Sequence, residues 1–185
     1  MRIRTRRAAA LVAGIALAML LVSTVWAHHT DITDPNDTSG ALDIRQVRVG
    51  HHAGKPVEFT VVTASKWRPR QIWDRGFLTV ALDTVGDERE EYRVLVRSTG
   101  KQLEATLWAI PKDLSKPDKL VRHLEVFRKT TDGVSVLLPP LWKLRFGVAR
   151  TFYRWWAVTM LTSEKCPHTC IDRAPNNGSV EQPRH

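Results

Sequence analysis

An alternation of apolar and polar side chains with a period of two residues runs through most of this sequence. Successive side chains of a β-strand point to opposite faces of the sheet, so this period is typical of strands that bury one face. After residue 27, no segment has the sustained period of 3.6 residues that an amphipathic helix needs. The sequence therefore predicts strands, most clearly at Val57–Val61, Leu78–Leu82, Tyr92–Val96, Leu103–Leu107 and Thr151–Leu161.

Turn-forming residues between the predicted strands indicate antiparallel neighbours. Val85–Asp87 and Thr99–Lys101 have hairpin spacing, and Thr131–Gly133 contains an Asp-Gly pair, which tolerates positive φ. This last turn would join the segments Leu120–Lys129 and Val134–Leu138. In another segment, from Leu42 to Val49, the alternation slips by one residue, which predicts a bulge near Arg45 or Gln46.

About eight strands result, and this number without interleaved helices is typical of an all-β domain. We expect two antiparallel sheets packed as a sandwich, either jelly-roll or immunoglobulin-like. Short helical turns fit at Arg70–Arg75 and Pro140–Gly147. The expected organisation is a signal peptide over 1–27, a polar lead-in over 28–40 that resists regular structure, the sandwich over 41–172 and a flexible tail over 173–185.

The first 27 residues have the order of a secretory signal peptide. Four arginines (Arg2, Arg4, Arg6 and Arg7) precede the uncharged stretch Ala8–Val22, and Val25-Trp26-Ala27 is a small-residue cleavage site. We expect the mature protein to be secreted or associated with the cell envelope, without a membrane span. A retained transmembrane anchor is the alternative, because the uncharged run is about as long as a spanning helix.

The charge of the mature chain points away from nucleic acid as a partner. Four of the 28 basic residues and none of the 19 acidic ones lie in the signal segment, which leaves 24 basic and 19 acidic residues, a net charge of +5. The basic residues are scattered among acids and form no base-reading motif.

The two cysteines, Cys166 and Cys170, predict a disulfide in an exported chain. A redox or metal-binding pair is the alternative.

Two acidic segments are candidate calcium sites. Asp34, Asp37 and Asp43 surround the start of the first strand, and Asp83 and Asp87 flank a hairpin turn. Calcium takes six to eight oxygen ligands from carboxylates and carbonyls on a turning backbone. The alternative is that aspartate and glycine are simply good turn residues.

The mature N-terminus suggests a second kind of metal site. Cleavage after Ala27 would make His28 the first residue, so that its α-amine and ring could chelate copper together with another histidine (His29, His51, His52 or His123). Secreted copper proteins such as lytic polysaccharide monooxygenases resemble this chain at that one position. The alternative is that the histidines are solvated loop residues.

Tryptophans and arginines in the connector before Leu78 form a candidate ligand-binding surface. Trp67, Arg68, Arg70 and Trp73 supply the indoles and guanidinium groups that sugar-binding platforms and protein interfaces use. The alternative is that the tryptophans belong to the core. Further along, Trp155 and Trp156 must point to opposite faces of their strand, so one of them is expected in the core.

Several segments together resemble a group of uncharacterised exported actinobacterial proteins. They are Asp34-Pro35-Asn36-Asp37-Thr38 before Leu42-Asp43-Ile44, the hairpin from Val80 through Asp87, Tyr153-Arg154-Trp155, and the ending Cys-Pro-His-Thr-Cys-Ile-Asp-Arg-Ala-Pro at 166–175. The resemblance implies export and a β-sandwich, but no activity. Relatives have a fuller acidic hairpin, from which Val85 departs. The acidic lead-in before Leu-Asp-Ile is also loosely similar to sugar-binding sandwich modules.

The sequence favours a binding protein over an enzyme. It contains no nucleophile elbow, no zinc-protease motif and no glycine-rich phosphate loop. We expect a non-catalytic module that binds an envelope polysaccharide or a surface protein, with calcium as the candidate cofactor. The alternative is a secreted copper enzyme, or another metalloenzyme, that uses His28.

Overall fold

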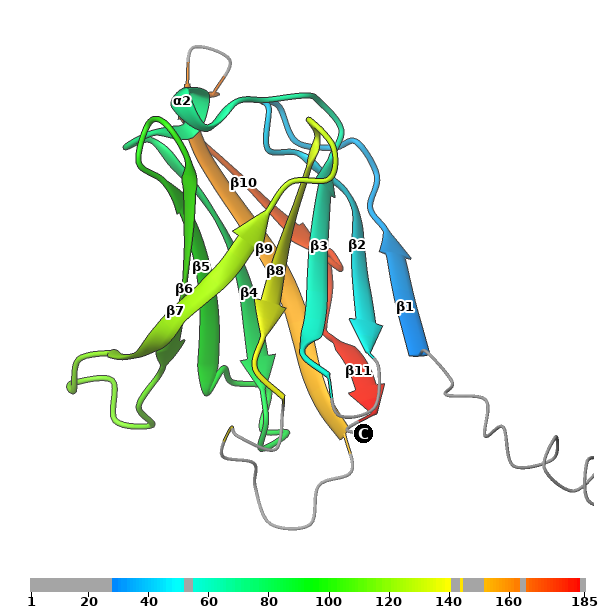
Figure 1. The fold of residues 1–185 in the computed structure, drawn as a ribbon. Coiled ribbons are helices and arrows are strands. Elements are labelled where there is room, and N and C mark those ends of the chain that lie inside the picture. The colour runs from blue at the N-terminus through cyan, green and yellow to red at the C-terminus, as the bar shows by residue number, and fades with distance from the viewer. Residues whose placement is uncertain (1–27, 52–54, 141–143, 145–151, 164–165, 184–185) are drawn as a thin grey trace, which may run out of the picture.

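The computed structural model describes residues 28–51, 55–140, 144, 152–163 and 166–183, and these residues are almost entirely strands (Figure 1). The predicted signal peptide and most of the predicted turn at Pro140–Gly147 lie outside them. The elements are β1 His28–Thr33, β2 Ile44–His51, β3 Val57–Thr63, α2 Pro69–Ile72, β4 Gly76–Asp83, β5 Tyr92–Ser98, β6 Leu103–Ala109, β7 Lys119–Phe127, β8 Gly133–Leu138, β9 Phe152–Ser163, β10 Cys166–Ala174 and β11 Val180–Pro183.

The described strands form one antiparallel sheet, which curls until it is nearly closed into a barrel (Figure 1). The strand order is β1-β2-β3-β8-β7-β6-β5-β4-β9-β10, and β11 pairs with β9 beyond the end of β10. The first part of β7 pairs with β6 and its last part, from Glu125 to Phe127, pairs with β8. Strand β7 therefore carries the sheet from one side of the barrel to the other.

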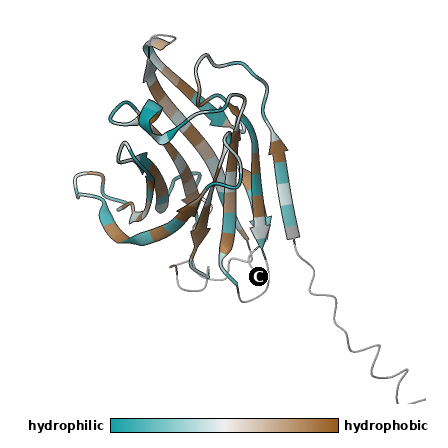
Figure 2. Ribbon diagram, turned by 45° about the horizontal axis from the view of Figure 1, so that its top comes forward, coloured by the Kyte–Doolittle hydropathy of each residue, from teal (hydrophilic) through white to brown (hydrophobic). Residues whose placement is uncertain are grey.

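The interior is one hydrophobic core to which almost every strand contributes. Brown and teal bands alternate along the strands in Figure 2, as expected when each strand turns one face inward. Trp155 and Phe59 come from β9 and β3, on opposite sides of the core, and their rings meet edge to face with centroids 5.7 Å apart. Both side chains are almost fully buried. Aromatic contact thus joins the two halves of the sheet.

The all-β antiparallel prediction is confirmed. All eight predicted strands are present as β2 to β9, the hairpin turns fall where expected, and the register shift between Ile44 and Gln46 is the predicted bulge. The short helical turn appears as α2, and Trp155 rather than Trp156 is the core residue. The count of about eight strands is too low, since the described residues hold eleven in one continuous sheet, and a division into two separate sheets is not confirmed.

The sequence did not predict three strands, which lie wholly or partly in the segments expected to be irregular, with most of β10 inside the predicted sandwich domain 41–172. Strand β1 occupies the start of the lead-in, and β10 and β11 extend into the expected tail. β1 is an edge strand with several exposed side chains, so it needs no apolar alternation. In β10 and β11, buried positions are taken by the polar residues Asp172 and Gln182, which hides the period.

The barrel closes along a line that we call the seam, where the start of β2 and the connector before it approach β10 and β9. Among the described residues no backbone ladder joins β2 to β10. Side chains bridge instead: the Ile44 amide donates to the Asp172 carboxylate at 2.5 Å, and the Thr159 hydroxyl donates to the Leu42 carbonyl at 2.7 Å. The seam is therefore closed by polar side chains that are themselves buried.

Cys166 and Cys170 form the predicted disulfide at the start of β10. Cys166 is buried beside the seam, and its Sγ lies 3.2 Å from the carbonyl oxygen of Ser39. Gly40 fits beside it with a φ of +111°, and a Cβ there would come within 2.9 Å of the same sulfur. The Cys166–Cys170 disulfide therefore forms part of the surface against which Ser39 and Gly40, in the connector between β1 and β2, pack. Within the described part of the chain, no helix has the length and apolar character to cross a membrane.

We predict that Trp155→Ala lowers the free energy of unfolding by about 3 to 5 kcal/mol, because it empties the centre of the core. Trp156→Ala is the matched control, since Trp156 lies on the outer face of the same strand with the Arg173 guanidinium 5.4 Å from its ring centroid. That variant should lose about 1 kcal/mol. Urea denaturation measures both, and equal losses would contradict this placement of the core.

Candidate functional site

Four aspartates gather at the seam, and we call them the seam cluster: Asp34, Asp37, Asp43 and Asp172. The first three lie in the connector between β1 and β2, and Asp172 comes from β10 at the other end of the sheet. One carboxylate oxygen from each of Asp34, Asp37 and Asp172 lies within 4.8 Å of the others. The Asp43 carboxyl lies near enough to Asp172 and Asp37 for their negative charges to contribute to its raised pKa. The fold thus brings together acidic residues that are far apart in sequence.

Backbone contacts hold the seam cluster in place. The Asp34 amide donates to the Arg45 carbonyl at 2.9 Å, and the Ala64 amide donates to the Asp43 carbonyl at 2.7 Å. Asp172 accepts the Ile44 amide on one oxygen and the Arg173 amide, at 2.7 Å, on the other. The acidic side chains are therefore fixed by the ends of the strands rather than by opposite charges.

Burial and mutual repulsion disfavour the charged forms of this cluster. Burial, followed by the negative charges of Asp172, Asp37 and Asp43, raises the pKa of Asp34 to about 6. Burial is also the largest cause of the raised pKa values of Asp43 and Asp172. Among the described residues, no lysine, arginine or histidine forms an ion pair with these four carboxylates. The cluster therefore concentrates negative charge that the protein itself leaves uncompensated.

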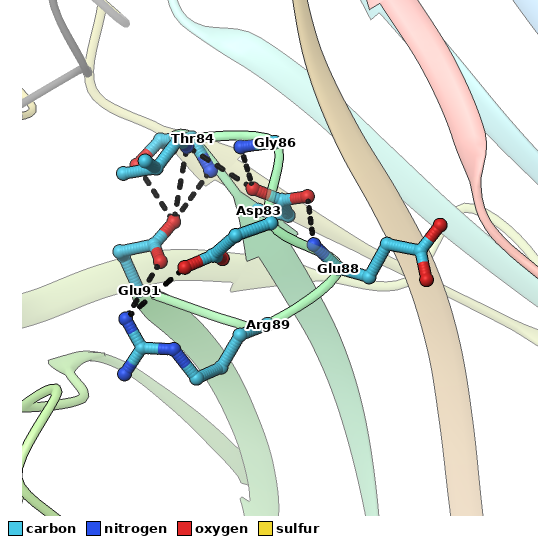
Figure 3. Close-up of polar contacts among 8 residues, drawn as sticks. Asp83, Thr84, Gly86, Glu88, Arg89 and Glu91 are labelled. Carbon is cyan, nitrogen blue, oxygen red and sulfur yellow. Dashed lines mark hydrogen bonds and ion pairs between the residues drawn. The ribbon is translucent and has the colours of Figure 1, made fainter.

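The second acidic segment forms a different structure, which we call the hairpin cluster: Asp83, Asp87 and Glu91 (Figure 3). One Asp83 oxygen accepts the amides of Val85 and Gly86, and the other accepts the Glu88 amide at 3.0 Å. These bonds fold the β4–β5 turn.

Glu91 is likewise engaged by the turn and by a cation. Its Oε2 accepts the amide of Thr84 at 2.8 Å and that of Val85 at 3.2 Å. Arg89 lies within ion-pair distance of Asp87 and Glu91, at 3.6 and 3.4 Å. The hairpin cluster therefore stabilises a turn with its own counter-charge, as the alternative interpretation of this segment expects.

The predicted tryptophan surface is divided by the fold. Trp67 is only 2% exposed, its Nε1 donates to the Thr63 hydroxyl at 3.1 Å, and the Arg128 guanidinium covers its ring at 4.0 Å. Trp73 is 51% exposed. Arg68 and Arg70, on and beside α2, are exposed and line neither of the depressions described below. Trp67 and Trp73 therefore do not share one exposed face.

Trp73 lines a depression of about 600 Å³ at the end of β4 and β5. Its indole packs against the hairpin turn at Gly100, where a Cβ would lie 3.3 Å from Cδ2 of the ring. Arg97, Ser98 and Glu104 supply polar groups around the same hollow, which we call the Trp73 depression. Sequence reasoning missed these three residues because their positions on β5 and β6 become neighbours of Trp73 only through strand pairing.

A second hollow of about 1050 Å³ borders the seam cluster, and we call it the connector depression. Asp37 and Asp43 line it together with residues 38–41 of the connector, and Lys66 and Gln71 contribute from the segment that contains α2. Arg75 lines both hollows, so the two depressions adjoin. The molecule thus has an aromatic depression and, beside it, a depression lined by both acidic and basic side chains.

The candidate copper ligands are distributed over the sheet. Strand pairing sets His28 opposite His51, with His29 opposite Gly50. His51 is buried, His29 is exposed, and His123 lies on β7. His52 is outside the described residues. No group of three potential metal ligands within the described ranges includes a histidine, so the copper interpretation stays a hypothesis.

We predict that the Asp34→Asn variant gains stability relative to the wild type as the pH rises from about 4 to about 7 in the presence of a chelator. The folded pKa of Asp34, about 6, exceeds its ordinary value of 3.8. Stabilisation by this group is therefore complete below 3.8 and is lost as the pH rises through 6, by on the order of 2 to 3 kcal/mol.

Chemical denaturation at a series of pH values measures the difference between variant and wild type. The control is Asp87→Asn, which makes the same substitution at an exposed carboxylate of the hairpin cluster. A difference between Asp34→Asn and wild type that stays constant from pH 4 to 7 would contradict the prediction.

The fold therefore provides three distinct features: the seam cluster with its depression, the Trp73 depression and a self-contained acidic turn. Comparisons with models of known families, with curated proteins and with solved structures gave no match to this chain. The resemblance to exported actinobacterial proteins accordingly stays a prediction, and what the protein does has to be argued from these three features.

Proposed function

We propose that this protein is a non-catalytic binding module that works outside the cytoplasm and takes a carbohydrate polymer as its ligand. The observation that carries the proposal is the Trp73 depression, where an exposed indole is surrounded by hydrogen-bonding side chains. Ligand sites of this kind combine apolar contact area with a few polar groups that fix orientation.

The indole of Trp73 is suited to stacking against the apolar face of a sugar ring. Gly100 supports the ring, and about half of the side chain remains exposed. Tryptophan offers a large apolar surface at a low cost in side-chain entropy. A supported but exposed indole is therefore a good platform for a repeating, flat ligand.

The polar neighbours of Trp73 match the hydroxyl groups of a saccharide. Arg97 donates hydrogen bonds in a planar fork, Glu104 accepts them, and Ser98 does either. Arg75 connects this hollow to the connector depression, where Lys66 and Gln71 offer further polar groups. Two adjoining polar hollows suit a chain of several sugar units better than a single small molecule.

The site of action that we propose is the cell envelope or the extracellular medium. The signal-like order of the first 27 residues supports export. The Cys166–Cys170 disulfide adds support, because such bonds persist mainly in oxidising compartments.

A copper enzyme that uses His28 is a second candidate, and one observation favours it. The pairing of β1 with β2 sets the backbone of His28 directly opposite that of His51, so the two residues lie on neighbouring strands. Copper coordination would further need the free α-amine of a mature chain that starts at His28.

We predict that peptide mass mapping of the exported protein finds a mature chain starting at His28. Metal analysis after reconstitution with copper then separates the two functions. A mature chain that starts at another residue would remove the copper candidate, and recovery of the uncleaved chain from the cytosol would contradict export. Stoichiometric copper that is lost in His51→Ala would favour the enzyme instead of the binding module.

We predict that Trp73→Ala weakens retention on polysaccharide by about 5- to 150-fold, because loss of one stacked aromatic costs about 1 to 3 kcal/mol. The assay measures depletion of the protein from solution by a panel of insoluble envelope and plant polysaccharides. Trp73→Phe should keep part of the affinity.

The matched control is Trp108→Ala, since Trp108 lies on β6 outside both depressions and its Nε1 donates to Thr106. Its affinity should equal that of the wild type. Unchanged binding by Trp73→Ala would overturn the proposed site, and failure to bind any polysaccharide while a surface protein is captured through Trp73 would overturn the ligand class.

A further inference from the structure

The seam cluster differs from the hairpin cluster in the state of its buried oxygens. Oδ2 of Asp34 and Oδ2 of Asp43 are both inaccessible to solvent, and neither has a hydrogen-bond partner in the described structure. The side chains carrying them are 9% and 2% exposed. An acceptor that is buried and unsatisfied destabilises the fold unless another group supplies the missing interaction.

The relation between Asp43 and Asp172 points to what is missing. Both side chains are buried in one cluster, and two carboxylates only accept hydrogen bonds. Such a pair is stable only when a proton or a cation lies between the two groups. Asp34 and Asp37 lie beside Asp172, so several acidic oxygens are close together.

The hairpin cluster shows how this protein satisfies acidic groups with its own backbone donors and an arginine. Both Asp83 oxygens accept backbone amides, and Arg89 supplies positive charge next to Asp87 and Glu91. The seam cluster has neither a full set of donors nor an ion pair among the described residues. The two clusters have similar composition, but no carboxylate oxygen of the hairpin cluster is both buried and unpartnered, as Oδ2 of Asp34 and Oδ2 of Asp43 are.

We propose that the seam cluster is a calcium site, with the carboxylates of Asp34, Asp37, Asp43 and Asp172 as its protein ligands. Calcium binds oxygen atoms at 2.3–2.6 Å, so ligand oxygens around one ion lie up to about 5 Å apart. The 4.8 Å limit that contains the oxygens of Asp34, Asp37 and Asp172 fits this geometry. The ligand set is all oxygen, which favours a hard cation over zinc or copper.

The position of the site indicates that the ion would stabilise the closure of the barrel. Three ligands lie in the connector before β2 and the fourth lies in β10, so the ion binds both sides of the seam. The same connector lines the adjoining depression through Asp37 and Asp43. Calcium would thus fasten the ends of the sheet together and fix one wall of that hollow. This inference does not rest on the proposed carbohydrate site at Trp73, because none of its ligands lines the Trp73 depression, although Asp37 and Asp43 line the adjoining connector depression.

The test is calcium titration of the purified, chelator-treated protein by isothermal titration calorimetry, with thermal unfolding as a second measurement. We expect one calcium ion per chain, a dissociation constant in the submillimolar to millimolar range typical of extracellular sites, and a Tm raised by several degrees in excess calcium. Absence of binding at millimolar calcium would overturn the proposal, as would magnesium binding with equal affinity.

Substitutions locate the site and separate binding from folding. Asp34→Asn and Asp43→Asn should each weaken calcium binding at least about tenfold, since each removes one negatively charged ligand. Asp34→Asn is the critical variant because its Oδ2 loses no hydrogen bond on substitution, so the variant should fold even if Asp43→Asn does not.

The matched control for these substitutions is Asp87→Asn, which makes the same change in charge in the hairpin cluster and should bind calcium like the wild type. Wild-type affinity in Asp34→Asn, or loss of binding in Asp87→Asn, would overturn the assignment. Trp73→Ala should leave calcium binding unchanged, so failure of the carbohydrate proposal and failure of this one give different results.

Discussion

Closure of the sheet across the seam is the constraint on which the rest of this structure depends. Elsewhere, neighbouring strands satisfy one another through backbone ladders, but β2 and β10 meet without one. Asp172 and Thr159 supply the missing bonds to Ile44 and Leu42 from buried positions. Buried polar groups of this kind must have hydrogen-bond partners. The stability of the core therefore depends on the polar contacts of the seam.

The sequence predicted the parts of the fold that depend on local pattern. Strands β2 to β9 have apolar residues at alternate positions, and the slipped alternation near Arg45 became the bulge. Strands β1, β10 and β11 were missed, because they are held by an edge pairing or have Asp172 and Gln182 at buried positions. Such strands are defined by their partners rather than by their own composition.

The residues of the candidate sites likewise fall into those that a local sequence pattern predicts and those that only long-range contacts bring together. Asp34, Asp37 and Asp43 could be found from sequence because they are close together in the connector, whereas Asp172 could not, since its place beside them depends on how the sheet closes. Trp67 and Trp73 have similar sequence surroundings but opposite environments. The ring of Trp67 lies under Arg128 in the core, and that contact joins residues more than 60 positions apart.

The position of strand β7, shared between both halves of the barrel, affects how the molecule unfolds. Its first part completes one half of the barrel and its last part completes the other, so neither half has its full set of partners alone. A single core lies between them, and no internal boundary separates two independently stable units. The barrel should therefore lose its structure cooperatively, in one all-or-none transition, and not half by half.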